Sequence, residues 1–186
     1  MKTTNEMQKY IYDQEEKWFS RFQPFLKGKV LKVGNGLGYF ASFIVKTNPD
    51  LTIIDVQKNE QAENKDKVVI YDGQHFPFDD NSFDCVVCTY VLHHTSYPLE
   101  VFNEMRRVAK RIIIIEETHS NIFAKLDLIY RDIYVNFLAG QPAKIHWKSY
   151  FRKGNLEKLF SKNNLTIITH QEERKRTYWK ELFILE

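Results

Sequence analysis

Five short apolar segments, rich in branched aliphatic residues, constrain the fold of this chain more than any other feature of its sequence. Polar connections or segments with helical patterns separate them. The segments cover residues 29–33, 51–56, 67–71, 83–91 and 111–117. Strands that alternate with helices in this way predict an α/β fold, in which helices cover both faces of a parallel sheet.

The rest of the chain supplies helices and a final pair of strands. Only about ten polar residues connect the second and third predicted strands, so a helix there has one or two turns or is missing. Helical patterns occupy residues 3–22, 39–47, 99–109, 120–140 and 152–162, and two late strands, which suit a hairpin, occupy residues 165–170 and 178–185. We predict one domain over residues 1–186, with a helical lid at 1–27 and a helical insertion at 118–150.

The charge balance argues against an electrostatically driven nucleic-acid binder. The chain has 27 basic and 24 acidic residues, a net charge of +3. Its strongest basic run, Arg174, Lys175 and Arg176, is interpreted as a solvated hairpin turn. No stretch approaches the ~20 apolar residues that span a bilayer, and the N-terminal residues lack the apolar core of a signal peptide. We therefore expect no membrane span and a cytoplasmic location.

The two cysteines, Cys85 and Cys88, have the C-x-x-C spacing of redox pairs and of half metal sites. They lie inside a predicted strand, where residues three apart point to opposite faces. We interpret both thiols as structural.

A cluster of glycines, Gly34, Gly36 and Gly38, directly follows the first predicted strand. Glycine permits a positive φ and removes the Cβ that blocks a ligand from the backbone. The spacing is G-x-G-x-G, and Tyr39 stands where a dinucleotide fingerprint has glycine or alanine. The loop also lacks the Lys-Ser/Thr ending of a P-loop, so a nucleoside ligand without a diphosphate is favoured.

An acidic residue, Asp55, ends the second predicted strand, 21 residues beyond Gly34. A carboxylate at this point of a doubly wound fold can accept hydrogen bonds from the hydroxyls of a ribose.

Residues 29–117, which contain these motifs, resemble the class I S-adenosylmethionine (SAM)-dependent methyltransferases, especially the ubiquinone/sterol-type group. The matching stretches are VLKVGNGLG, TIIDV, YDGQHFPFDDNSFDCVV, TYVLHHTSYP and EMRRVAKRIIIIEE. The resemblance implies a doubly wound, Rossmann-like, seven-stranded sheet, mostly parallel with the last strand antiparallel. It also implies that SAM lies across the carboxyl ends of the first strands.

The same resemblance implies roles for particular residues. The methionine part of SAM would be surrounded by Gly34, Asn35, Gly36 and Gly38. The ribose and adenine would be held by Asp55, Val56, Gln57, Asp72, Gly73 and Gln74, with Asp72 accepting from the adenine amino group. The floor near the sulfonium would be formed by Thr89, Tyr90 and Val91.

Two positions depart from the family pattern. Lys32 stands where the family usually has an acid, and it could pair with the SAM carboxylate, point away from the site, or weaken SAM binding. The usual Pro-Gly-Gly before the fifth strand is missing, because Lys110 meets Arg111 directly.

Methyl transfer is an in-line displacement, and positioning of the two reactants supplies much of its rate. A general base is needed only for a weakly acidic acceptor, and the candidates are His93, His94 and His119, each of which also suits loop capping or packing. Glu116 and Glu117 could cap the next helix or take part in the reaction. The histidines, cysteines and carboxylates show no metal-ligand spacing, and the adjacent rings of His93 and His94 are expected to diverge, so we predict no metal.

The insertion is expected to roof the acceptor pocket with aromatic side chains, although core packing explains the same pattern. The apolar side of its helix would be formed by Phe123, Leu126, Ile129, Tyr130, Ile133 and Phe137. The predicted acceptor-binding residues are Tyr10, Tyr130, Tyr134 and Trp147.

The favoured hypothesis is therefore an enzyme that transfers a methyl group from SAM to a small, apolar or amphiphilic acceptor and leaves S-adenosylhomocysteine. The first alternative is a methyltransferase-like binding or regulatory protein without catalysis, which Lys32 motivates. The second is an RNA or protein methyltransferase. The sequence leaves the acceptor, the methylated atom and the oligomeric state open.

Overall fold

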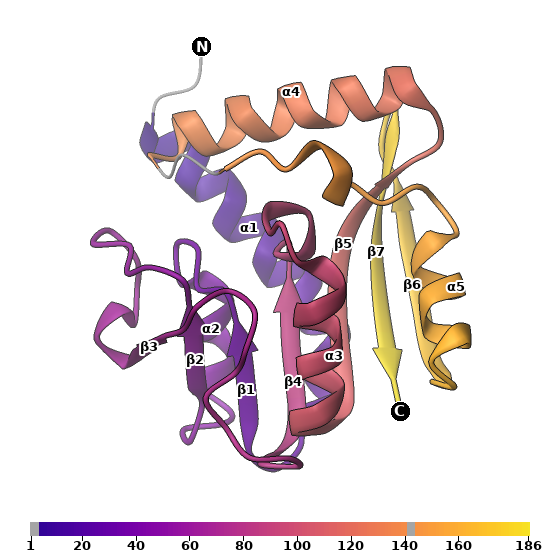
Figure 1. Ribbon diagram of the computed structural model, residues 1–186. Helices are drawn as coiled ribbons and strands as arrows, with labels where there is room; N and C mark the ends of the chain where they lie inside the picture. Colours follow the sequence, from indigo (N-terminus) through magenta and orange to yellow (C-terminus); the bar gives the residue numbers. More distant parts are fainter. Residues whose placement is uncertain (1–3, 141–143) are drawn as a thin grey trace.

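All seven strands of the computed structural model, which describes residues 4–140 and 144–186, form one sheet in the order β3-β2-β1-β4-β5-β7-β6 (Figure 1). The strands are β1 (Val30–Val33), β2 (Thr52–Asp55), β3 (Val68–Ile70), β4 (Phe83–Thr89), β5 (Ala109–His119), β6 (Ile167–Arg174) and β7 (Tyr178–Leu185). Neighbours among β1 to β5 pair in parallel, and β7 is antiparallel to both β5 and β6. The predicted doubly wound sheet with an antiparallel last strand is confirmed.

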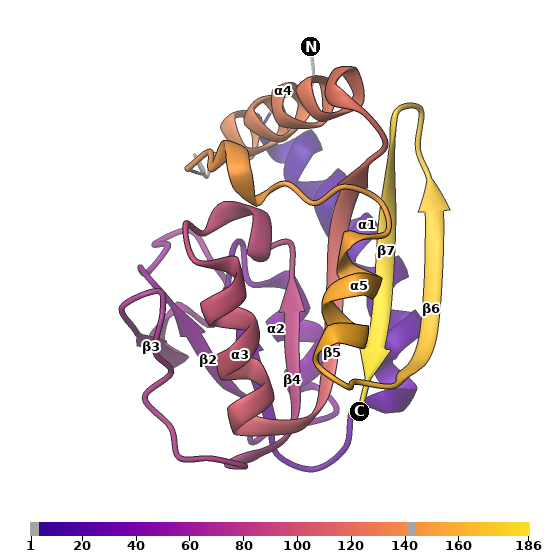
Figure 2. The same cartoon turned by 45° about the vertical axis from the view of Figure 1, so that its right-hand side comes forward.

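Helices cover both faces of the sheet, with α1 and α2 behind it and α3 and α5 in front (Figures 1 and 2). The α-helices are α1 (Thr4–Phe22), α2 (Tyr39–Val45), α3 (Pro98–Val108), α4 (Ile122–Leu138) and α5 (Asn155–Lys162). Short 3₁₀ turns are η1 (Gln23–Phe25), η2 (Lys65–Lys67), η3 (Leu92–His94) and η4 (Trp147–Ser149). The single turn η2 confirms the short crossover expected between β2 and β3. No described helix is long and apolar enough to cross a membrane.

Two buried clusters, one on each face, hold the layers together. Trp18 and Phe22 of α1 pack with Val87 of β4 on one face. Phe102 of α3 and Phe160 of α5 pack against the other face. Burial of such side chains contributes about 1.5–3 kcal/mol each.

The two cysteines belong to these opposite clusters. Cys85 is buried with the α1 side and Cys88 with the α3 side, and both are free thiols. The prediction that the thiols do not meet is confirmed.

Strand β1 lies between β2 and β4, at the point where the strand order reverses. The carboxyl ends of parallel strands at such a point leave a crevice. Helix α4 crosses above these strand ends, beside the first turns of α1 (Figure 1). Met7 of α1 and Leu138 of α4 share a small buried cluster with Leu37. The lid at 1–27 and the insertion at 118–150 stay predictions, and residues 1–3 and 141–143 lie outside the described residues.

Helix α4 turns its apolar stripe outward, and our prediction for this face was wrong. Phe123 is 78% exposed, Tyr130 69% and Phe137 70%, whereas only Ile129 of the predicted stripe is buried. The helix buries Ala124, Leu128, Ile129, Asp132 and Leu138 instead, and its Arg131, Asp132, Val135 and Asn136 line a cavity. Strand β5 is also longer than predicted, since α3 ends at Val108 and the strand begins at the next residue.

Gly38 and Gly154 provide a matched pair of stability tests. They precede α2 and α5 with φ values of 85° and 86°. A Cβ on Gly38 would lie 2.2 Å from the carbonyl oxygen of Glu63, whereas a Cβ on Gly154 meets nothing within 4 Å. We expect Gly154→Ala to lower the free energy of unfolding by about 1–2 kcal/mol through its backbone alone. Gly38→Ala should cost about 2 kcal/mol more, because the Glu63 backbone must also move.

Urea denaturation of both variants measures the difference. Equal losses of stability in the two variants would contradict the close packing of Gly38 against Glu63.

Candidate functional site

A cavity of about 790 Å³ opens at the carboxyl ends of β1, β2 and β4. Its walls come from the loops that follow these strands and from α1, α4 and β7. Gly36 and Asp55 both line it, so the glycine loop and the acid after the second strand share one crevice. This is the arrangement that the sequence motifs require.

Hydrogen bonds tie the glycine loop to Asp55. The backbone N–H of Asn35 donates to Asp55 Oδ2 at 2.6 Å, and the N–H of Val56 donates to Oδ1 at 2.7 Å. Gly34 has a φ of 72°, and a Cβ there would lie 2.4 Å from a methyl group of Val91. Glycine is therefore needed at this point for the loops after β1 and β4 to approach each other.

Most residues predicted to bind the cofactor line this cavity. They are Gly34, Asn35, Gly36, Asp55, Val56, Gln57, Asp72, Gly73, Thr89, Tyr90 and Val91. Gly38 and Gln74 do not line it, and their contact with a cofactor stays a prediction. Gly38 packs against the Glu63 backbone, and the N–H of Gln74 is held in a turn by Asp72 Oδ1 at 2.7 Å.

Asp72 is engaged by its own turn. The backbone N–H of His75 donates to Oδ1 at 2.7 Å, and the His75 ring lies 2.8 Å from Oδ2. These contacts and the N–H of Gln74 lower the pKa of Asp72 to about 2. The carboxylate is ionised at neutral pH and lies at the cavity wall.

Lys32 is buried and lines the cavity, so it does not point away from the site. Its ammonium donates to the carbonyl oxygens of Val33 at 2.9 Å and Gly34 at 2.7 Å. Burial lowers the pKa of Lys32, while nearby Glu15 and Asp55 favour its charged form. The lysine therefore supplies hydrogen-bond donors to backbone carbonyls at the start of the glycine loop.

Glu15 of α1 places a carboxylate in the same region, which the sequence did not reveal. Its Oε2 accepts from the N–H of Phe40 at 3.1 Å. Burial raises the pKa of Glu15 to about 7, although Lys32 and Lys180 favour the ionised form.

An ionic network forms another wall. Arg131 of α4 donates to both carboxylate oxygens of Glu117 at 2.9 and 3.1 Å, and Lys180 of β7 lies 3.3 Å from the same group. Lys180 also lies 3.5 Å from the hydroxyl of Tyr90. Tyr90 has a φ of 55°, a left-handed conformation that is uncommon for a non-glycine residue and concentrates at functional sites.

His93 and His94 lie together on the η3 turn, with ring centroids 4.1 Å apart, so the expected divergence was wrong. His93 Nδ1 lies 2.5 Å from buried Glu116. Burial alone lowers the pKa of His93, but Glu116 and Asp132 outweigh it and raise the pKa to about 9. Burial and the neighbouring His93 lower the pKa of His94. Both rings line the cavity and face Asp132 of α4.

Five other residues that the sequence predicts at the site differ in whether they line the cavity. Tyr10 lines the cavity, but Tyr130, Tyr134 and Trp147 are exposed and do not line it. Tyr130 and Tyr134 lie on the outer side of α4, whereas Trp147 lies on the η4 turn. His119 is also outside the lining, because β5 extends to it and its Nε2 lies 3.3 Å from the carbonyl oxygen of Tyr150.

The expected aromatic roof is replaced by a polar one. The α4 residues that line the cavity are Arg131, Asp132, Val135 and Asn136. A partial signal for this was present in the sequence, since Arg131 and Asp132 are adjacent charged residues in a largely apolar helix, and a buried charged group needs water or a partner. Glu15 and Lys180 had no such signal, because α1 and β7 reach the site only through the tertiary fold.

Comparisons with known proteins match a family model over part of the chain and a known fold over most of it. Residues 31–112 match the model of a family described as a methyltransferase domain. Two uncharacterized proteins of Methanocaldococcus jannaschii are similar in sequence, one at 31% identity over 111 residues and the other at 35% over 103. These alignments cover 58% and 54% of this chain and 46% and 48% of the relatives. The chain thus spans about half the length of the curated relatives that it matches.

Solved structures resemble the whole described fold. The geranyl diphosphate C-methyltransferase of Streptomyces coelicolor superimposes with a TM-score of 0.71 at 10% identity, covering 98% of this chain and 83% of that one. A SAM-dependent methyltransferase of Aquifex aeolicus gives 0.61 at 20% identity, covering 92% and 88%. At these identities the similarity concerns the fold.

Lys32 generates a stability prediction. Lys32→Met keeps most of the side-chain stem but removes the donor to the buried Val33 carbonyl and the half-buried Gly34 carbonyl, so we expect the free energy of unfolding to fall by about 2–4 kcal/mol. Urea denaturation measures this, with the exposed Lys27→Met as the control, which should change stability by less than about 0.5 kcal/mol. A Lys32→Met variant as stable as the control would contradict the structural role of this ammonium.

Proposed function

We propose that this chain is a class I SAM-dependent methyltransferase, as its fold and its methyltransferase-domain segment support, and that it transfers a methyl group from SAM to a small-molecule acceptor. The observation that carries the proposal is the shared crevice of the glycine loop and Asp55, with the Asn35 N–H bonded to the Asp55 carboxylate. Backbone at the end of β1 and a carboxylate at the end of β2 suit the two halves of an adenosyl cofactor.

The donors and acceptors of the crevice fit SAM. Asp55 retains lone pairs toward the cavity for ribose hydroxyls, since a carboxylate offers about four acceptor positions. Buried Asn35 Oδ1 has no hydrogen-bond partner among the described residues and supplies an acceptor beside the glycine loop. Glu15, close to Lys32, supplies an anionic group for the cationic methionine part.

SAM, when bound, supplies an activated methyl group on a sulfonium. The protein's task is to hold the acceptor in line with that methyl, because positioning can supply much of the rate. Tyr90, between the glycine loop and the ionic wall of Glu117 and Lys180, is the residue we place nearest the reacting atoms. His93 and His94 stay candidates for contact with the acceptor.

The polar walls favour a polar acceptor rather than the apolar one expected from the sequence. Arg131, Asp132 and Lys180 line the part of the cavity under α4. Charged groups at a cavity wall recognise charged or hydrogen-bonding ligands, since an apolar ligand would remove their water without replacing its hydrogen bonds. We propose a small acceptor with oxygen or nitrogen donors.

Asp55→Asn tests the cofactor assignment. We expect the affinity for S-adenosylhomocysteine to fall about 10- to 100-fold, because one charged acceptor position becomes an amide donor. Isothermal titration calorimetry measures the change, with Asp50→Asn, an exposed change outside the cavity lining, as the control.

If the wild-type chain binds neither SAM nor S-adenosylhomocysteine at millimolar concentrations, the proposal fails. Equal binding by Asp55→Asn and wild type would remove Asp55 from the assignment.

Glu15 predicts a pH dependence. Its pKa is raised to about 7, so the carboxyl ionises as the pH rises from 6 to 8. The ionised form attracts the cationic cofactor, and SAM affinity should therefore increase with pH. The gain should be about tenfold relative to Glu15→Gln, since a charged hydrogen bond contributes about 1.5 kcal/mol or more.

Comparison with Glu15→Gln at each pH removes the effect of SAM's own amino group, which loses its charge near pH 8. Glu16→Gln, at the exposed neighbouring position, should retain the wild-type profile. Parallel profiles for wild type and Glu15→Gln would show that Glu15 does not contact the cofactor.

A further inference from the structure

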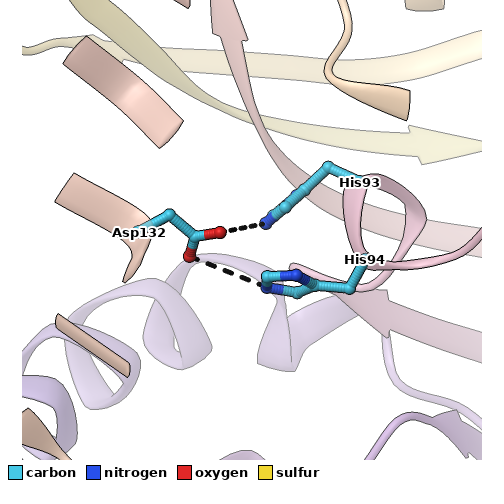
Figure 3. A group of neighbouring side chains, drawn as sticks. All are labelled: His93, His94 and Asp132. Carbon is cyan, nitrogen blue, oxygen red and sulfur yellow. Dashed lines mark ion pairs between the residues drawn. The ribbon is translucent and has the colours of Figure 1, made fainter. Parts of the chain in front are cut away.

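Three side chains with metal-ligating atoms converge at the cavity wall. His93 and His94 come from the η3 turn after β4, and Asp132 comes from α4 (Figure 3). One ligand atom from each lies within 4.8 Å of the others. All three residues line the same cavity as the glycine loop.

The hydrogen bonds of the two rings determine which nitrogen faces Asp132. His93 Nδ1 is bonded to the Glu116 carboxylate at 2.5 Å, and His94 Nδ1 lies 3.3 Å from the carbonyl oxygen of Lys144. Both partners are acceptors, so each ring donates through Nδ1. A neutral histidine that donates through Nδ1 presents a lone pair on Nε2, as metal-binding histidines do.

The two Nε2 atoms lie 4.0 and 3.7 Å from the carboxylate oxygens of Asp132. These distances are too long for hydrogen bonds. A tetrahedral Zn²⁺ with bonds of about 2.1 Å separates its ligand atoms by about 3.4 Å. The three ligand atoms lie no more than 4.8 Å apart, so the side chains must move closer together to share one ion.

Each potential ligand is also held by a second partner. Buried Glu116 fixes His93, and its other oxygen accepts from the N–H of Leu92 at 2.8 Å. For Asp132, the Tyr150 hydroxyl donates to Oδ2 at 2.6 Å and the Asn136 amide donates to Oδ1 at 2.7 Å. Carboxylates behind histidines and donors behind carboxylates are typical of protein metal sites.

We propose that His93, His94 and Asp132 bind one divalent transition-metal ion of the Zn²⁺ class. Two imidazoles and one carboxylate suit zinc or iron, and three protein ligands leave a position open toward the cavity. That position would take an oxygen of the acceptor and lower its pKa, a role that rests on the proposed function, whereas the metal site itself does not. This departs from the sequence prediction that no metal is needed.

A second cluster, Glu157, His170 and Glu181, serves as a comparison. Lys153 donates to Glu181 at 2.6 Å and also forms an ion pair with Glu172. A resident ammonium already neutralises that cluster, so it has less need of a metal ion.

The test is titration of the untagged full chain with Zn²⁺ by calorimetry and with Co²⁺ by visible absorption, without SAM. We expect one ion per chain and Co²⁺ bands typical of four- or five-fold coordination. Removal of a ligand in His94→Gln or Asp132→Asn should weaken binding more than about 100-fold, beyond the usual effect of second-layer changes. His170→Gln should leave binding unchanged.

Urea denaturation shows that each variant remains folded, and calorimetry with S-adenosylhomocysteine separates the two proposals. If the chain binds the metal but no nucleoside, the metal site is supported and the proposed function is contradicted. The metal proposal is overturned if the folded wild type does not bind one Zn²⁺ ion per chain. The cluster would then hold a proton on His93 instead of a metal ion. Binding that survives in His94→Gln, or disappears in His170→Gln, overturns it as well.

Discussion

The backbone at the carboxyl end of β1 must find hydrogen-bond partners inside the protein, and much of the site follows from this requirement. β1 is paired on both sides and buried on both faces, so its last carbonyls and the following N–H groups are shielded from water. Lys32 donates to the carbonyls of Val33 and Gly34, and Asp55 accepts from the N–H of Asn35. Two opposite charges are thereby fixed beside the crevice by the needs of the backbone.

Buried charges of this kind are costly unless they are paired, and the pairs join the outer elements to the sheet. Glu15 brings α1 toward Lys32 on β1. Arg131 of α4 and Lys180 of β7 meet at Glu117 on β5. The helices above the strand ends are thus positioned by electrostatic contacts as well as by apolar packing, and this leaves the space beneath them polar.

The sequence predicted those features that depend on neighbours along the chain. Branched aliphatic runs identified the strands, and the spacing from Gly34 to Asp55 identified two loops that meet because consecutive parallel strands end at one edge. Gly38 packs against the Glu63 backbone, which the sequence could not reveal, because a glycine in a positive-φ turn serves packing as well as ligand binding. Glu15 reaches the site through the packing of α1, which no local pattern encodes.

Helix α4 shows why an amphipathic pattern alone does not orient a helix. An apolar stripe turns inward when the inside is a packed core, but α4 covers a cavity whose other walls are charged. Asp132, buried under this helix, is tolerated there because Tyr150, Asn136 and the two histidines surround it. Contacts of this carboxylate and of Arg131, together with the packing of Leu128, Ile129 and Leu138, favour this side of the helix, while Phe123 and Phe137 remain exposed.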